Sequence, residues 1–181
     1  AYHSRQLLRS RCEQERHLDQ ILKRKEKHNE QPVAFSNQVI RQHLNSTDAE
    51  HVIFILVATP VEEVGRDHDF DWAIIEPSSY RSIIQLAGRV LRHRKLEQDI
   101  QQPNIGLMQF NLKGLRNAKV AFEKQKKKKN TSKGSFKLET KNLSELLDLG
   151  ETAKINAIPR IQECQLLQAK KKLADLEHAV M

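Results

Sequence analysis

The sequence predicts an α/β domain with a mostly parallel sheet, and three observations support this fold class. Residues 52–58 are apolar throughout, as in a parallel strand that is buried on both faces. Two further strand-like segments follow at residues 72–75 and 105–110. A helical pattern at residues 80–91 separates those two segments, so strands and helices alternate.

The segments before and after this alternation predict helices. Residues 6–27 are rich in Arg, Glu, Gln, Lys and Leu, and their leucines recur at helical intervals. Residues 37–44 predict a short helix, followed by a turn at 45–48. Near the end of the sequence, residues 143–149 predict a helix ended by Gly150, and residues 165–180 a longer one.

The change in character after residue 110 divides the chain. We expect a sheet-containing lobe over residues 1–113, a basic linker over 114–140 and the start of a helical accessory region over 141–181. The sequence has no initiator Met and ends within a helical pattern, so we expect it to be part of a larger protein.

Composition excludes several classes of protein. Of the 181 residues, 38% are hydrophobic and 30% are charged, as in a soluble globular chain. No apolar run approaches the ~20 residues of a membrane span, and no secretory signal is recognisable, which predicts a cytoplasmic location. Cys12 and Cys164 lack metal-type spacing, so neither a disulfide nor a zinc site is expected, and both should be reduced, small apolar side chains.

The charge of +8 suggests a polyanionic partner, although net charge alone is a weak signal. Much of the excess lies between residues 123 and 137, where seven Lys stand against one Glu and residues 126–129 are all Lys. This stretch is either a solvated loop or a loop that contacts nucleic acid.

The predicted helix at 80–91 carries the most informative pattern. Gln85, Arg89 and Arg92 are spaced by four and three residues, which aligns them in one stripe, and Gly88 leaves a flank of that stripe open. A guanidinium stays charged and offers a planar fork of donors to phosphate oxygens. The pattern alone is compatible with a phosphate-binding stripe or with a solvated basic face.

Three segments resemble helicase motifs. Gln85-x-x-Gly88-Arg89-x-x-Arg92 resembles motif VI of superfamily 2 helicases, and residues 57–67, which run from a strand to Gly-Arg-Asp, resemble motif V. The tetrapeptide Tyr-His-Ser-Arg at 2–5 resembles motif IV of the CRISPR-associated helicase-nucleases of type I systems. Residues 63–71 also resemble that family, and residues 76–85 are most similar to its I-F branch.

The resemblance covers residues 2–94 and implies that they form the second RecA-like lobe of such an enzyme. It implies that Gln85, Arg89 and Arg92 are catalytic and face a nucleotide bound on the partner lobe, with the arginines at the γ-phosphate. It assigns Gly65, Asp67 and Gly88 to the nucleotide as well; in particular, the carboxylate of Asp67 would accept hydrogen bonds from the ribose. The alternative for the Asp67 segment is a solvated acidic loop.

The resemblance also implies a site for DNA. Thr59 would bind a backbone phosphate of the tracked strand, and His3, Ser4 and Arg5 would contact the same backbone. Alternatively, Thr59 simply ends a strand before Pro60. Pro60 replaces a common Gln, and Gly65 stands where commoner type I sequences have Ser; both fit the I-F branch.

The function implied is that of an ATP-dependent single-stranded DNA translocase with 3′-to-5′ polarity, coupled to a nuclease and recruited by the CRISPR surveillance complex for antiviral DNA degradation. Its cofactors would be ATP, Mg²⁺ held through the first RecA-like lobe, and a nuclease metal elsewhere in the parent protein. The sequence contains no Gly-x-x-x-x-Gly-Lys-Ser/Thr loop, so we expect this chain alone not to hydrolyse ATP.

Two other functions remain open. One is the same lobe in a restriction or repair motor, and the other is a basic nucleic-acid-binding module without turnover. No metal site is predicted in this chain: His68-Asp69 matches the dipeptide of an HD nuclease, but the further His and Asp residues of such a site are missing.

Overall fold

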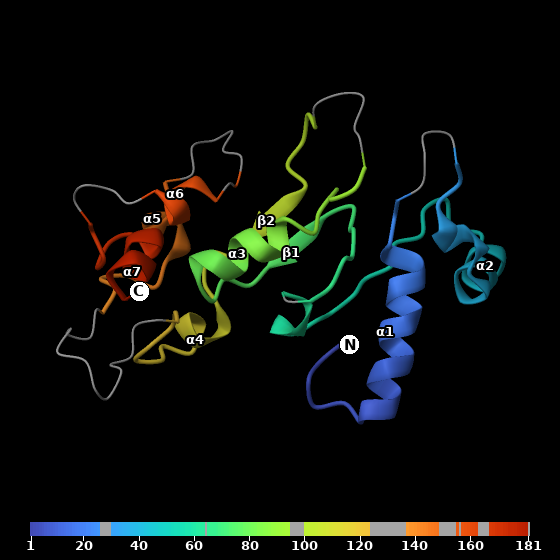
Figure 1. Ribbon diagram of the computed structural model, residues 1–181, viewed down its shortest axis with the longest axis horizontal. Helices are drawn as coiled ribbons and strands as arrows, with labels where there is room; N and C mark the ends of the chain where they lie inside the picture. Colours follow the sequence, from blue (N-terminus) through green and yellow to red (C-terminus); the bar gives the residue numbers. More distant parts are fainter. Residues whose placement is uncertain are drawn as a thin grey trace. The chain divides into compact units, whose positions relative to one another are not determined.

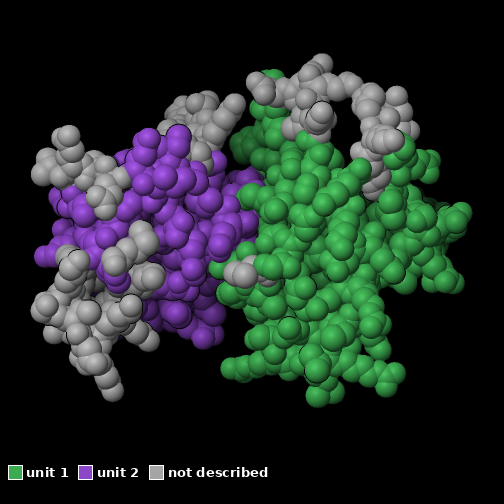
Figure 2. Space-filling view, in the orientation of Figure 1, with its two compact units in different colours: residues 1–72, 88–104 green, residues 73–87, 105–181 purple. Residues whose placement is uncertain are grey.

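The computed structural model describes residues 1–25, 30–63, 65–94, 100–123, 137–148, 155, 157–162 and 167–180 (Figure 1). Predictions for the lysines at 126–129, for Gly150 and for Cys164 lie outside the described residues. The chain forms two compact units (Figure 2). Unit 1 comprises Ala1–Trp72 and Gly88–Asn104, and unit 2 comprises Ala73–Ala87 and Ile105–Met181. The division at residues 113 and 140 stays a prediction.

Unit 1 contains the helices α1 (Leu8–Leu22) and α2 (Gln38–Asn45) and the 3₁₀ turns η1 (Val33–Ser36) and η2 (Pro60–Glu62). Both predicted helices are confirmed, although α1 ends five residues before the predicted bound of 27. The side chain of Asn37 accepts hydrogen bonds from the amides of Val39 and Ile40, which fixes the start of α2.

The predicted strand at 52–58 is wrong for this structure. Only Ala58 forms a bridge, parallel to Tyr2, and the segment is largely exposed, with Ile53 at 64% and Ile55 at 76%. A strand buried on both faces needs a neighbour along each edge and a layer over each face. Among the described residues, this segment has Tyr2 at one edge and no second strand.

Unit 2 contains the parallel pair β1 (Ala73–Ile75) and β2 (Ile105–Leu107), joined in register from Ala73↔Ile105 to Ile75↔Leu107. A parallel pair requires a crossover connection, and α3 (Tyr80–Ala87) lies between the two strands in sequence. This arrangement confirms the α/β class and both predicted strands, although β2 ends three residues before the predicted bound.

Four further helices complete unit 2 as described: α4 (Leu112–Leu115), α5 (Leu143–Leu146), α6 (Ile158–Ile161) and α7 (Leu173–Val180). The helix predicted at 165–180 therefore begins only at Leu173. The backbone amide of Gln168 donates to Asp175 at 2.8 Å, which stabilises a turn where the helix was expected to run.

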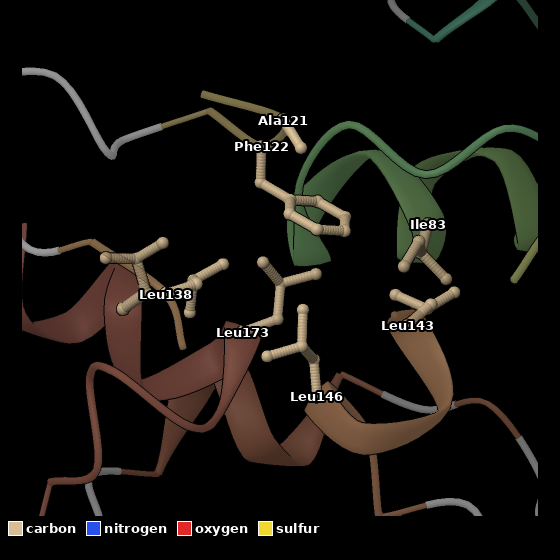
Figure 3. Packing of buried hydrophobic residues seen from close by; sticks show 8 residues of the cluster. Ile83, Ala121, Phe122, Leu138, Leu143, Leu146 and Leu173 are labelled. Atoms are coloured by element: carbon tan, nitrogen blue, oxygen red, sulfur yellow. The ribbon is translucent and has the colours of Figure 1, made fainter. Parts of the chain in front are cut away.

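The core of unit 2 joins α3 to the C-terminal helices (Figure 3). Leu173 and Leu176 of α7 are fully buried, and Leu143 and Leu146 of α5 are nearly so. With them in one cluster lie Ile83, Ala121, Phe122 and Leu138. This apolar contact is the main reason that residues 73–87 and 105–180 form one unit.

Two smaller predictions concern the cysteines and membranes. Cys12 is a free thiol, as expected of a reduced cysteine, and it is exposed. None of the described helices is long and apolar enough to cross a bilayer.

Candidate nucleotide and DNA site

The arginine segment does not continue the helix. α3 ends at Ala87, so the predicted helical stripe through Gln85, Arg89 and Arg92 is wrong. Beyond the exposed Gly88, the chain pairs with another segment of unit 1: Phe70 N donates to Arg89 O at 2.8 Å, and Leu91 N donates to Phe70 O at 2.9 Å. Leu91 adopts a left-handed φ of 51°, which is incompatible with a continuing helix.

The partner of this arginine segment is the extended stretch 67–71. Side chains alternate along an extended backbone, so Asp67 and Asp69 contact the arginine segment, whereas His68 between them contacts Asp19 of α1 and Glu62. The side chains of the acidic loop therefore contact the arginine segment on one side and α1 with Glu62 on the other.

Asp67 is the centre of the contacts made by Arg92. Its carboxylate forms an ion pair with Arg92 Nε at 3.1 Å, contacts His93 Nε2 at 2.8 Å and pairs with Lys25 Nζ at 2.6 Å. The hydrogen bond from Lys25, and then that from His93, outweigh desolvation and lower the pKa of Asp67 to about 2. The described contacts therefore favour an ionised Asp67.

Arg92 is held by one side of its guanidinium. The ion pair uses Nε, and the side chain is 41% exposed. The described residues offer no hydrogen-bond partner to its two terminal nitrogens. The planar fork is thus oriented by Asp67 and remains able to donate to an oxyanion.

Arg89 is buried with most of its donors unsatisfied. It is 6% exposed, and its Nη2 donates to Glu63 O at 3.2 Å, while Nε and Nη1 have no hydrogen-bond partner among the described residues. Burial and the nearby charge of Arg92 lower the pKa of Arg89. Unsatisfied buried donors are costly, so this guanidinium would gain from an incoming anion.

The other predicted nucleotide residues differ in their surroundings. Gly65 is exposed and has φ +73°, a conformation that explains glycine at this position. Gln85 belongs to unit 2, where it lies half-buried on α3 with its Oε1 unpaired among the described residues. Unit 1 thus brings together Asp67, Arg89 and Arg92.

The four predicted DNA residues lie on two adjacent segments of unit 1. Tyr2 N donates to Val57 O at 2.8 Å, and Thr59 N donates to Tyr2 O at 3.0 Å. This pairing brings the start of the segment 3–5 close to Thr59. Ser4, Arg5 and Thr59 are exposed, so their side chains are accessible to a ligand.

The residues that support the arginines were missed at the sequence level. Asp69, His93 and Arg94 were assigned no role, and neither was Lys25. A signal was available: Asp67-x-Asp69-x-Asp71 and Arg92-x-Arg94 both have a spacing of two, typical of extended segments that pair through opposite charges.

The charge-paired segments also explain the HD dipeptide. His68 is fully buried, with Nδ1 at 2.6 Å from Glu62 and Nε2 at 3.3 Å from Asp19. Asp69 is equally buried and accepts from Arg94 Nη2 at 2.8 Å. Both side chains hold neighbouring segments together.

Comparison with known proteins identifies the family. Residues 1–95 match the family model described as CRISPR-associated nuclease/helicase Cas3, C-terminal. The chain belongs to this family. It is 42% identical over 178 residues to the CRISPR-associated nuclease/helicase Cas3 subtype I-F/YPEST of Pseudomonas aeruginosa. It is 39% identical over 181 residues to the protein of the same description from Pectobacterium atrosepticum.

These alignments cover 98% and 99% of this chain but 16% of each relative. The chain therefore spans about one sixth of the length of these relatives. The resemblance of residues 2–94 to the I-F branch is confirmed, and the similarity to these relatives extends through the C-terminal region as well.

Proposed function

We propose that this chain contributes the second, RecA-like motor lobe to a Cas3-type helicase-nuclease of CRISPR type I interference. In this proposal the longer protein is an ATP-dependent translocase on single-stranded DNA, and this chain supplies the arginines that act on the nucleotide. The orientation of Arg92 by Asp67, within a chain of the Cas3 family, is the observation that carries the proposal.

The proposed nucleotide contacts follow from donor chemistry. Arg92 would present its terminal nitrogens to the γ-phosphate, and the unsatisfied nitrogens of Arg89 would donate to neighbouring phosphate oxygens. An arginine placed in this way contributes ~10³–10⁵ to the rate of phosphoryl transfer. We also propose Gln85, from its place in the segment that resembles motif VI, and Gly88 and Gly65 as nucleotide contacts; neither glycine carries a side chain that would block the nucleotide.

Asp67 can also serve the ribose. A carboxylate has roughly four acceptor sites; here Arg92 Nε and His93 Nε2 both approach Oδ1, and Lys25 Nζ approaches Oδ2. One ribose hydroxyl could therefore be accepted without releasing Arg92.

The proposed DNA contacts are His3, Ser4, Arg5 and Thr59. Hydroxyl groups and cationic side chains are the usual partners of phosphate oxygens in a nucleic-acid backbone. The bridge between Tyr2 and Ala58 supports a common role, because it brings the two segments side by side.

Other parts of the site would come from outside this chain. We propose that the preceding lobe supplies the phosphate-binding loop and the ligands of Mg²⁺, and that the nuclease with its metal and the surface for the CRISPR surveillance complex lie elsewhere in the longer protein. On this proposal the isolated chain does not hydrolyse ATP.

The test is ATP hydrolysis by the longer protein with and without single-stranded DNA. We expect Arg92→Ala to lower DNA-stimulated kcat by ~10³-fold or more while DNA affinity stays within about twofold. Arg5→Ala with Thr59→Ala should show the reverse, a loss of DNA affinity. Arg41→Ala, an exposed arginine of α2, is the matched control and should leave both unchanged.

Two results would contradict the proposal. If no DNA-stimulated hydrolysis is measured in the unaltered protein, the motor function fails. If Arg92→Ala weakens DNA binding and leaves turnover intact, the lobe is a basic nucleic-acid-binding module.

A further inference from the structure

Asp69 joins three segments of unit 1 and is fully buried. Its backbone N–H donates to the carbonyl of Leu22, the last residue of α1, at 2.9 Å. Its Oδ2 accepts from the backbone N–H of His93 at 3.0 Å, and its Oδ1 accepts from Arg94 Nη2 at 2.8 Å. Asp69 therefore links the backbone directly after Arg92, through its carboxylate, to the end of α1, through its own backbone N–H.

Arg94 extends this attachment. The same Nη2 donates to Phe70 O at 2.7 Å, and Nη1 donates to Asp71 at 2.5 Å. A guanidinium can serve several acceptors in one plane, which an ammonium cannot. The backbone before Arg92 is held by the pairing of Phe70 with Arg89 and Leu91. The backbone after Arg92 is held by Asp69 and Arg94.

Among the described residues, the guanidinium of Arg92 pairs with Asp67, two residues before Asp69 on the same extended stretch. The position of its guanidinium is set by the register between residues 67–71 and 89–94. Charge-assisted hydrogen bonds to a fully buried carboxylate such as that of Asp69 are well suited to fixing such a register.

We propose that Asp69 is a positioning residue for ATP hydrolysis: through His93 N and Arg94 it holds the backbone that presents Arg92 to the nucleotide. This inference rests on the proposed function and goes beyond it, because Asp69 and Arg94 lie outside the helicase motifs. Asp69 does not itself touch the nucleotide.

The consequence is a specific kinetic effect. A misplacement of about 1 Å in a catalytic group can cost ~10²-fold in rate. Loss of the Asp69 contacts should therefore lower kcat, because the arginine acts in the transition state, while ground-state binding of ATP changes little.

The experiment measures DNA-stimulated ATP hydrolysis by the longer protein carrying Asp69→Asn. The asparagine keeps the shape of the side chain but replaces one acceptor oxygen with an NH₂ group. We expect kcat to fall about 10- to 100-fold with the KM for ATP within about twofold. Binding of ADP with aluminium fluoride, a transition-state mimic, should weaken by a similar factor, and binding of ADP alone should not.

Two companion variants separate positioning from folding. Arg94→Lys keeps the positive charge but cannot reach Asp69, Phe70 O and Asp71 together. We expect it to lower kcat with little change in the KM for ATP, so it provides the same test where Asp69→Asn does not fold. Asp71→Asn is the matched comparison, because Asp71 contacts the same Arg94 but its side chain is 61% exposed. We expect this exposed position to lose less than about threefold in kcat, since water can replace its contacts.

Combining Asp69→Asn with Arg92→Ala tests whether Asp69 acts on ATP hydrolysis through Arg92. If Asp69 acts through Arg92, the two substitutions are not additive, and Asp69→Asn lowers the residual rate little further. Additive losses, equal weakening of ADP and of the mimic, or wild-type kcat in a folded Asp69→Asn protein would each overturn the inference. If Arg92→Ala alone leaves hydrolysis unchanged, the proposed function fails, which is recognised independently of Asp69.

Discussion

The hydroxyl group of Tyr2 donates a 2.7 Å hydrogen bond to Oε1 of Glu15, on the middle turns of α1. The same oxygen accepts from Arg11 at 3.0 Å and from Arg66, whose guanidinium lies 5.8 Å from the centre of the Tyr2 ring. Tyr2 precedes the proposed DNA residues, and Arg66 precedes Asp67. Glu15 therefore links the two proposed ligand sites to one helix.

We expect Tyr2→Phe to loosen the N-terminal segment. The substitution keeps the fully buried ring but removes one hydrogen bond to a charged group, worth ~1.5 kcal/mol or more, which corresponds to about a tenfold change in an equilibrium constant. Amide hydrogen exchange of residues 2–6 in the longer protein should accelerate by roughly this factor, while α2 keeps its protection. Unchanged exchange at residues 2–6 would show that the hydrogen bond does not restrain this segment.

The low pKa of Asp67 makes a prediction about pH. Its folded pKa of about 2 lies below the ordinary value of 3.8, so its stabilising contribution is present above pH 3.8 and is lost as the pH falls through 2. Lys25 is the largest cause of the shift, so Lys25→Met should raise the pKa of Asp67 toward 3.8. The measurement is a titration followed by the ¹³C shift of labelled Asp carboxyls, with Asp67→Asn identifying the signal.

Lys23→Met is the control for that titration. Lys23 pairs with Asp19 at 3.8 Å on the same helix end but does not contact Asp67. The Asp67 titration should be the same in Lys23→Met as in the unaltered protein. A pKa near 3.8 in the unaltered protein would contradict the contact with Lys25.

The local patterns of the sequence predicted the elements that depend on neighbours in sequence. α1 was identified from its helix formers, α2 as a short helix before a turn, and β1 and β2 from their short apolar runs. The prediction failed where a distant segment competes for the backbone. The pairing of Phe70 with Arg89 and Leu91 ends the helical pattern after Ala87, and nothing in the residues 80–91 themselves indicates that partner.

The candidate site was predicted in part for the same reason. Motif spacing singled out Asp67, Arg89 and Arg92, which the structure brings into one charged cluster. Asp69 and Arg94 were missed because each is an ordinary charged residue until residues 67–71 and 89–94 are aligned. Burial of Asp69, which distinguishes it from Asp71, is a tertiary property that no periodicity reports.

For the apolar segment at 52–58 we predict that a charged substitution has different effects on the stability of this chain and of the longer protein. Ile55 is 76% exposed here, so Ile55→Asp should change the stability of this chain by less than about 0.5 kcal/mol. Its continuous apolar pattern is that of a strand covered on both faces, so in the longer protein we expect a loss of ~3 kcal/mol or more from an unpaired buried charge.

Urea denaturation of both proteins measures this difference. Leu7→Asp is the matched control, because Leu7 is 80% exposed and lies at the start of α1, where an acidic residue is favourable. Both proteins should tolerate Leu7→Asp. Equal tolerance of Ile55→Asp in the longer protein would mean that the segment stays exposed there.

Asn111 provides a test of unit 2. Its Nδ2 donates to Pro77 O and Ala121 O, both at 2.9 Å, and its Oδ1 accepts from Gly114 N at 2.8 Å, while the residue is 4% exposed. Asn111→Ala leaves the two carbonyl groups without this partner, and each buried unsatisfied group costs ~1–3 kcal/mol. We expect a destabilisation of about 2–4 kcal/mol, measured as faster amide exchange across α3, β2 and α4.

Gln109→Ala is the control for Asn111, because it removes an exposed amide side chain two residues away that makes no hydrogen bond among the described residues. It should leave exchange unchanged. Asn111 connects the ends of β1 and β2 to the segment that carries Phe122 of the core. Its loss should therefore accelerate amide exchange in both strand ends and in that segment together. If exchange accelerates only around α4, the amide of Asn111 caps that helix and contributes nothing to holding the sheet to the core.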